Sequence, residues 1–235
     1  MSQHQTLNKR RKTNDTKTEG SEMNQRGKFI TLESGEGGGK TSVVSNLRKI
    51  LGHDDFVYVN DPGSFTPELS HIRNILLSSE FNLSNDAELL LYAAARVQLV
   101  DSIISPALQS GKHVISDRFS DSTSVYQGYI RGYDRYKLDI LNTEFAGNLI
   151  PDLTILLDVD AKVGLSRSLD RLEANDIDEG RWESMGLAVH ERINQAFRNI
   201  AASEPNRFHV INSNNLTIDE MTEEALIAIG QRIIG

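Results

Sequence analysis

The chain has 235 residues, 38% hydrophobic and 25% charged, so it can bury a substantial core, and its length allows at most two domains. It contains no apolar run near the roughly 20 residues that span a bilayer and no apolar secretory signal, so we expect a cytoplasmic protein with no membrane partner. The absence of cysteine excludes disulfides, Fe–S clusters and thiolate metal sites, and the six histidines show no ligand spacing. Any metal is therefore expected to be a hard cation held by oxygen.

The charge is unevenly distributed along the chain. Residues 1–28 carry a net charge of +4, so the remainder carries −12 within the total of −8. We expect 1–27 to be a disordered basic extension and 28–235 to be one folded domain that binds no nucleic acid. The cluster Lys9-Arg10-Arg11-Lys12 is open to two interpretations, a targeting or nucleic-acid patch or a solvated, dispensable extension, and we favour the second.

From residue 28 onward, short β-rich apolar runs alternate with helical patterns. Strands are predicted at 28–33, 56–60, 113–116, 153–159 and 208–212, with helices at 41–52, 67–79, 86–109, across 121–147, at 161–174 and 183–203, and from 217. This alternation predicts an α/β fold in which helices cover both faces of a five-stranded parallel sheet. Ligands of such sheets bind at the carboxyl ends of the strands. The polar segments that follow strands, 34–40, 60–66, 117–127 and 160–182, are thus where we expect the chemistry.

The first of these segments, Ser34 to Thr41, reads Ser-Gly-Glu-Gly-Gly-Gly-Lys-Thr. It matches the phosphate-binding P-loop pattern at every defined position except the first, where serine replaces glycine. A glycine-rich turn before a helix would explain the glycines but not the lysine and hydroxyl that follow them. We therefore predict a three-layer fold of the P-loop NTP hydrolase type, with a nucleotide's phosphates on the loop and on the positive end of the next helix. The predicted phosphate-binding residues are Ser34, Gly35, Gly37, Gly38, Gly39, Lys40, Thr41 and Ser42.

Later segments narrow the class of nucleotide-binding protein. No Asn-Lys-x-Asp signature for guanine is present, which argues against a GTPase. Tyr92 and Arg96 lie four residues apart, so a helix would present both on one face, where they could stack on a base and bond its edge. From spacing alone, a core aromatic beside a solvated arginine is the commoner arrangement. Asp117 and Arg118 stand at the end of a predicted strand, where an arginine can clamp a phosphate.

These segments together resemble the thymidylate kinase family of P-loop nucleoside-monophosphate kinases. The resemblance rests on "FITLESGEGGGKT", "ELLLYAAARVQ", "PALQSGKHVISDRFSDSTSVYQGYIRG" and "PDLTILLDVD", and it covers essentially 28–235. It implies transfer of a phosphoryl group from Mg²⁺-ATP to dTMP, giving dTDP and ADP in dTTP biosynthesis, by an enzyme that is usually a homodimer. The P-loop contains no arginine, so the chain resembles the bacterial type, in which arginines of a lid at about 160–182 act on ATP.

The resemblance also implies a role for each matching position. Tyr92 would stack on thymine, Arg96 would bond the base O4, and Thr123 and Gln127 would contact the base edge. Arg73 and Arg118 would hold the acceptor phosphate. The other implied substrate-binding residues are Glu36, Asp61 and Tyr126; the implied catalytic residues are Lys40, Arg118, Arg167, Arg171 and Arg181; and the implied metal site is formed by Thr41, Asp117 and Asp158.

The chain departs from the family's bacterial pattern in one loop, where Asn60-Asp61-Pro62-Gly63-Ser64 replaces Arg-Glu-Pro-Gly-Gly. The shorter carboxylate of Asp61 leaves a kinase of another pyrimidine deoxynucleotide, or of a modified dUMP analogue, as an alternative. An alternative from another class is a P-loop ATPase that docks on nucleic acid through its basic tail. Any of these kinases would need positioned positive charge more than a general base, because a phosphate monoester with a second pKa near 6 is already largely a dianion.

Overall fold

The computed structural model describes residues 26–78, 80–175 and 182–234, with only the backbone described at 171–175 and 183. Residues 1–25 of the predicted basic extension, including the cluster at 9–12, lie outside the described residues, as does the part of the predicted lid from 176 to 181. The last two residues of the predicted extension are described, and Arg26 forms an ion pair of 2.9 Å with Asp152. Within the described part of the chain, no helix is both long enough and apolar enough to cross a membrane.

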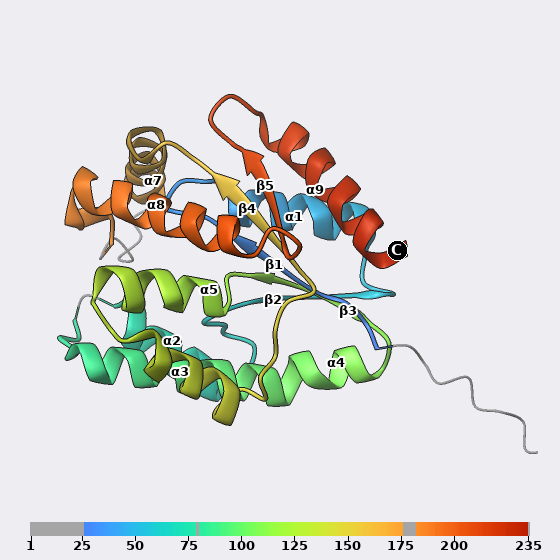
Figure 1. Ribbon diagram of the computed structural model, residues 1–235, viewed down its shortest axis with the longest axis horizontal. Coiled ribbons are helices and arrows are strands. Elements are labelled where there is room, and N and C mark those ends of the chain that lie inside the picture. The colour runs from blue at the N-terminus through green and yellow to red at the C-terminus, as the bar shows by residue number, and fades with distance from the viewer. Residues whose placement is uncertain (1–25, 79, 176–181, 235) are drawn as a thin grey trace, which may run out of the picture.

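A parallel sheet forms the centre of the molecule, as predicted (Figure 1). In the described residues it has five strands in the order β2-β3-β1-β4-β5. Leu32 of β1 pairs with Asp117 of β3 on one side and Ile155 of β4 on the other, so the carboxyl ends of the three central strands meet. The segment that follows β1 therefore emerges at the middle of that edge. The strands are β1 (Phe29–Glu33), β2 (Phe56–Asn60), β3 (His113–Asp117), β4 (Leu153–Asp158) and β5 (Phe208–Asn212).

Helices cover both faces of the sheet, so the fold has three layers (Figure 1). One face packs against α1 (Lys40–Leu51) and α9 (Ile218–Ile234). The other face packs against a continuous helical run and against α8 (Leu187–Ser203). That run comprises α3 (Asn85–Leu99), the π-helical turn η1 (Val100–Ile104) and α4 (Ser105–Gln109). The remaining elements are α2 (Pro67–Leu77), α5 (Ser120–Thr123), η2 (Ser124–Ile130), α6 (Arg135–Ile140), η3 (Leu141–Phe145), α7 (Ala161–Asn175) and η4 (Glu183–Met185).

The alternation of side chains along β1 explains why both faces are covered. Ile30 and Leu32 are fully buried against α1 and α9, while Phe29 is fully buried on the opposite face among side chains of α3 and α4. A strand that is apolar on both faces is stable only when helices cover each of them. The second helical layer starts at capped positions: the side chains of Thr66 and Ser84 accept hydrogen bonds from backbone N–H groups at the starts of α2 and α3.

Candidate functional site

The glycines of the segment after β1 are needed for its close packing. Gly37 and Gly39 have φ of 68° and 92°, which favours glycine. A Cβ atom on Gly37 would lie 1.9 Å from the carbonyl oxygen of Gly164, so the loop packs directly on the backbone of α7. The last glycine, Gly39, is the N-cap of α1. The loop therefore directs bare backbone and the positive end of a helix toward the carboxyl edge of the sheet.

Lys40 begins α1 and is buried beneath the loop. Its Nζ donates a hydrogen bond of 2.8 Å to Oγ of Ser34, the residue that departs from the P-loop pattern. Burial, and secondly the nearby positive charge of Arg118, lower the pKa of Lys40 to about 8. A buried cation with a neutral partner is well suited to receive a negatively charged ligand.

Arg118, directly after β3, has a strained backbone that turns its side chain toward the P-loop. Its φ is 70°, unusual for a residue with a side chain and costing on the order of 1–3 kcal/mol. Ser116 Oγ stabilises this turn by donating to the Arg118 carbonyl oxygen at 2.7 Å. The guanidinium lies 3.1 Å from Oε1 of Glu36, which also accepts a 2.6 Å hydrogen bond from the Tyr126 hydroxyl. Burial acts to raise the pKa of Glu36, but Arg118, Lys40 and the Tyr126 hydroxyl outweigh it and lower that pKa to about 2.

Glu33, the last residue of β1, is linked to Arg118 through the Ser122 hydroxyl. It is not among the site residues predicted from the sequence. Its carboxylate accepts hydrogen bonds from the Phe119 N–H at 2.8 Å and the Ser122 hydroxyl at 2.6 Å, and that hydroxyl in turn accepts from Arg118 at 3.1 Å. Burial, and then the negative charge of Asp121, raise the pKa of Glu33 to about 7. No local sequence pattern indicates that this acidic residue is buried, because the residues that bond to it lie more than 80 positions away in the sequence.

A second group of polar side chains lies between α3 and the segment after β3. Arg96 is only 6% exposed, which excludes the solvated arginine that its spacing alone favoured. Its Nε donates to Asp61 at 2.7 Å, and one Nη donates to the Thr123 hydroxyl at 2.6 Å. The other carboxylate oxygen, Oδ1 of Asp61, is buried and has no hydrogen-bond partner among the described residues. Burial raises the pKa of Asp61, and the charge of Arg96 opposes that rise.

Both groups open into one cavity of about 1080 Å³. A cavity of this size accommodates ligands larger than a typical drug-sized molecule. Of the residues predicted from the sequence to form the site, those that line it are Glu36, Gly37, Gly38, Gly39, Lys40, Thr41, Ser42, Asp61, Arg73, Tyr92, Arg96, Asp117, Arg118, Thr123, Tyr126, Gln127 and Arg167.

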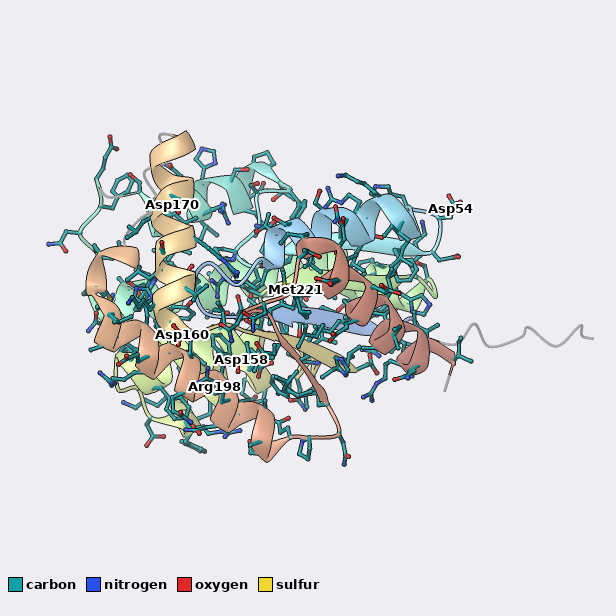
Figure 2. All side chains as sticks on the ribbon, turned by 90° about the horizontal axis from the view of Figure 1, so that it is seen from above. Asp54, Asp158, Asp160, Asp170, Arg198 and Met221 are labelled. Carbon is teal, nitrogen blue, oxygen red and sulfur yellow. The ribbon has the colours of Figure 1, made fainter. Side chains whose placement is uncertain are left out.

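The other predicted site residues are placed differently. Ser34 and Gly35 belong to the loop but are not among the residues that line the cavity. Asp158 is not either, and both of its carboxylate oxygens lie within 3.0 Å of Nε of Arg198 on α8; the two residues lie side by side in Figure 2. The side chain of Arg171 and the whole of Arg181 lie outside what the structure describes, so their roles stay predictions.

The loop after β5 also lines the cavity and was missing from the sequence-based site. Leu216 and Thr217 lie there, and Ile218 at the start of α9 lines the cavity beside them. The guanidinium of Arg167 on α7 donates to the carbonyl oxygens of Ser213 and Asn214 at 3.3 and 3.2 Å. The rule that ligands bind at the carboxyl ends of strands applies to β5 as well, and the polar run 212–215 after it was the available signal. Trp182, whose ring centroid is 4.7 Å from that of Tyr126, is another lining residue that is not among the predicted site residues.

A parallel sheet with a glycine-rich phosphate loop after its central strand, and an arginine aimed at that loop, defines the class of P-loop phosphotransferases. The family model described as "Thymidylate kinase" matches residues 32–225. A thymidylate kinase of Cereibacter sphaeroides is 42% identical over 210 residues, covering 88% of this chain and 96% of the relative, and one of Geobacter sulfurreducens is 44% identical over 194 residues, covering 80% and 90%. The crystal structure of a thymidylate kinase from Ehrlichia chaffeensis is similar, with a TM-score of 0.68 and 30% identity, covering 87% of this chain and 99% of that one. The chain belongs to the thymidylate kinase family.

Proposed function

We propose that the protein transfers the γ-phosphoryl group of Mg²⁺-bound ATP to the 5′-phosphate of dTMP in this cavity, and that the residues lining it have the following roles. The reaction itself, ATP-dependent phosphorylation of dTMP, is that of the family to which the chain belongs. The observation that carries the assignment of residues is the position of Arg118. Its guanidinium lies between the P-loop, through Glu36 and the Ser34 carbonyl, and the aromatic end of the cavity, through Tyr126. A donor phosphate on the loop and an acceptor phosphate on Arg118 would be neighbours.

The donor side uses fixed positive charge. The backbone amides of Gly37, Gly38 and Gly39 and the N-terminus of α1 would hold the β- and γ-phosphates, with Lys40 leaving Ser34 to reach them. Because charge spreads over the transferred phosphoryl group, such positioned cations supply most of the catalysis. Arg167 already lies at the cavity, anchored to the loop after β5, and we assign it to the donor nucleotide.

The acceptor side would bind dTMP along the cavity wall formed by α3 and η2. Arg73 and Arg118 would hold its 5′-phosphate, and Tyr92 would stack on the base. Since the acceptor phosphate is largely a dianion above its second pKa near 6, no residue has to remove a proton from it. Arg118 orients the attacking oxygen, and the depressed pKa of Glu36 keeps that carboxylate charged so that it holds the guanidinium in place.

The residues at the mouth of the cavity fit a magnesium ion. The Thr41 hydroxyl donates to Oδ2 of Asp117 at 2.9 Å, so two oxygen ligands of the kind Mg²⁺ prefers already lie together. In the described residues, no cluster of three or more His, Cys, Asp or Glu side chains could hold a metal. The proposed ion would be bound mainly by phosphates and water. When bound, Mg²⁺ would neutralise charge on the ATP oxygens. Asp158 fits this role less well because its carboxylate is paired with Arg198.

The decisive experiment is ADP release with Mg²⁺-ATP and a panel of dTMP, dUMP, dCMP, ribo-TMP and thymidine. We expect turnover to be highest with dTMP, and Arg118→Ala to lower it by about 10³-fold or more while the protein stays folded. Turnover with thymidine but not dTMP would overturn the acceptor site. ATP hydrolysis indifferent to every acceptor would favour the nucleic-acid-docking ATPase instead.

Two further predictions accompany this function. The family resemblance implies a homodimer, which sedimentation or light scattering would test directly. A cytoplasmic location likewise stays a prediction.

A further inference from the structure

Glu88, in the first turn of α3, is a buried carboxylate that does not line the cavity but contacts a residue that does. It is 1% exposed, and its Oε1 accepts a hydrogen bond of 3.1 Å from Nε2 of Gln127 on η2. Its other oxygen, Oε2, lies 3.2 Å from Nη2 of Arg131, which belongs to the turn after η2. The carboxylate therefore connects α3, through these two hydrogen bonds, to η2 and the turn after it, which lie above α3 in Figure 1.

This contact fixes which end of the Gln127 amide faces the cavity. An ionised carboxylate is acceptor-only, so it binds the NH₂ end of an amide and rejects the carbonyl end. Gln127 is 3% exposed, and its amide nitrogen faces Glu88, so its Oε1 is turned away from that carboxylate. Since Gln127 also lines the cavity, Oε1 is the acceptor that it can offer to a ligand, while Glu88 holds an N–H of the same amide. Gln127 thus presents an acceptor.

Arg96 lines the same cavity and offers hydrogen-bond donors in place of an acceptor. A guanidinium has only donors, whichever nitrogen faces a ligand. The two residues together offer a donor beside an acceptor, which complements a pyrimidine edge carrying O4 and N3–H, as in thymine and uracil. Cytosine carries the reverse pattern, a donor amino group at C4 and an acceptor at N3. Its amino group would face the donors of Arg96, and its N3 would face the acceptor of Gln127.

We propose that Glu88 is a positioning residue for base selection, which holds the Gln127 amide so that the site accepts thymine and uracil and rejects cytosine. The inference rests on the proposed function and on the base contacts that the family resemblance implies for Arg96 and Gln127. Without the carboxylate, Gln127 could rotate its amide by half a turn and donate to N3 of cytosine. Arg131 supports Glu88 by keeping an ion pair on its outer oxygen, and Trp182 lies under that guanidinium at 5.1 Å.

The test compares kcat/KM for dTMP, dUMP and dCMP in the wild type and in Glu88→Gln, whose amide can either donate or accept. We expect the dTMP-to-dCMP ratio to fall by about 10- to 100-fold, because one mispaired hydrogen bond is relieved. The dTMP-to-dUMP ratio should stay unchanged, since both bases carry the same O4 and N3–H edge. A variant that merely loosened the pocket would alter both ratios, and that result would overturn the proposal, as would an unchanged dTMP-to-dCMP ratio.

The matched control is Asp86→Asn, which removes the same charge from the same helix. Asp86 is exposed, and its carboxylate accepts a hydrogen bond from the Tyr133 hydroxyl and not from Gln127, whose amide nitrogen donates to Glu88. Both substrate ratios of Asp86→Asn should therefore equal those of the wild type. Calorimetric binding of dCMP provides a second readout, in which Glu88→Gln should bind dCMP more tightly than the wild type does. If Glu88→Gln fails to fold, Arg131→Met carries the test, with a smaller fall of the dTMP-to-dCMP ratio expected and an unchanged ratio contradicting the inference. A wild type inactive on dTMP would instead reject the proposed function itself.

Discussion

Ser34 places a hydroxyl where the P-loop pattern has a glycine, and this hydroxyl accepts a hydrogen bond from Lys40, which we propose binds the phosphates of ATP. Its Oγ accepts from Lys40 Nζ at 2.8 Å and donates to the Gly35 carbonyl oxygen at 2.6 Å. The hydroxyl also explains a neighbouring glycine, because a Cβ atom on Gly38 would lie 2.4 Å from it. Serine and glycine at these two positions are therefore sterically coupled.

Replacing Ser34 with glycine should tighten ATP binding. Lys40 gives up its bond to the hydroxyl when it reaches the phosphates, and removing one hydrogen bond of this kind should lower the Kd for ATP by about three- to tenfold. Titration calorimetry with ATP measures this. Ser34→Ala is the matched control, since it removes the hydroxyl but keeps the Cβ atom: if only the glycine variant binds ATP more tightly, backbone freedom is the cause and the competition with Ser34 is rejected.

The lowered pKa of Lys40 predicts a pH dependence of ATP affinity. Burial and Arg118 place that pKa at about 8 in the free protein, so Lys40 is charged below that pH and increasingly neutral above it. ATP favours the charged form, so its affinity should fall as the pH rises through about 8, and binding above that pH should take up a proton. Calorimetry in buffers of different ionisation enthalpy detects both effects. In Lys40→Arg the side chain stays charged, so an equal pH dependence in that variant would show that another group is titrating.

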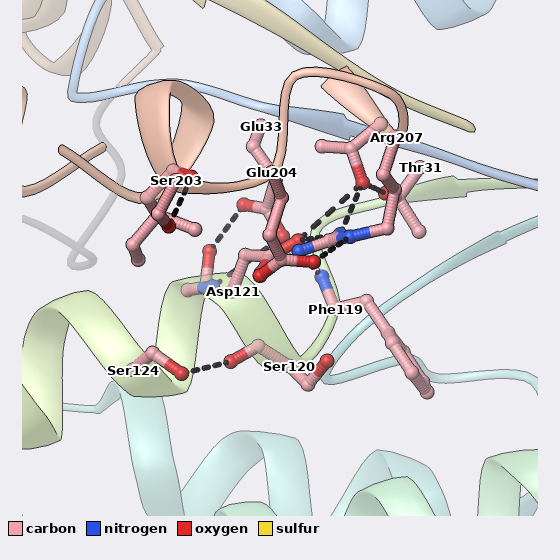
Figure 3. A network of polar contacts seen from close by, with 12 residues as sticks. Thr31, Glu33, Phe119, Ser120, Asp121, Ser124, Ser203, Glu204 and Arg207 are labelled. Atoms are coloured by element: carbon pink, nitrogen blue, oxygen red, sulfur yellow. Dashed lines mark hydrogen bonds and ion pairs between the residues drawn. The ribbon is translucent and has the colours of Figure 1, made fainter. Parts of the chain in front are cut away.

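At the scale of elements, a buried polar network joins α5 to the edge of the sheet (Figure 3). Arg207, just before β5, donates to both carboxylate oxygens of Asp121 at 2.7 and 2.9 Å and to the Thr154 hydroxyl of β4 at 2.7 Å. Thr154 in turn bonds Thr31 of β1 at 2.8 Å. The network lies beneath Glu33, whose pKa Asp121 helps to raise, so it connects the packing of the sheet to the residues that support Arg118.

Removing one partner of the Arg207–Asp121 ion pair should destabilise the protein more than removing both partners together. The side chains of Arg207 and Asp121 are only 12% and 8% exposed, so Arg207→Met leaves a poorly solvated carboxylate and should lower the free energy of unfolding by about 3–5 kcal/mol. Asp121→Ala should lower it by less, because Arg207 keeps its ion pair with Glu204 at 2.7 Å. The double variant should lose clearly less than the sum of the two. Urea unfolding monitored by circular dichroism gives all three values. Strict additivity would mean that the two residues act independently, contrary to their geometry.

A local sequence pattern predicts the elements of this chain that it determines, whereas contacts between residues distant in the sequence leave no local pattern. The P-loop and the segment after β3 were predicted because glycines, a lysine and an arginine stand directly after apolar strands. The helical stretch across 121–147 is interrupted, since Gly132 has a φ of 83° and the chain leaves the helical conformation there. The pairing of Asp158 with Arg198 could not be foreseen, because it joins β4 to a helix 40 residues away and depends on the packing of α8.

At the scale of the whole molecule, the charge is divided between the folded domain and the segment before it. Residues 1–28 carry a net +4 and the remainder carries −12, and the site contacts described above all come from residue 33 onward. The family model likewise begins its match at residue 32. Catalysis and any binding of nucleic acid should therefore depend on separate parts of the chain.

Deleting residues 1–22 should leave kcat/KM for dTMP within about twofold of the full chain, because the family model matches residues 32–225 and does not include the deleted segment. The full chain should bind double-stranded DNA weakly, with a log–log salt slope no steeper than about −4 if the four basic residues at 9–12 each neutralise one phosphate. The deletion should abolish that binding, because the acidic remainder repels phosphates. A full-length variant with glutamine at 9–12 is the control, since it removes the charge but keeps the length. DNA binding by the deleted protein would place a nucleic-acid surface on the folded domain, and a loss of turnover on deletion would make the segment part of the kinase.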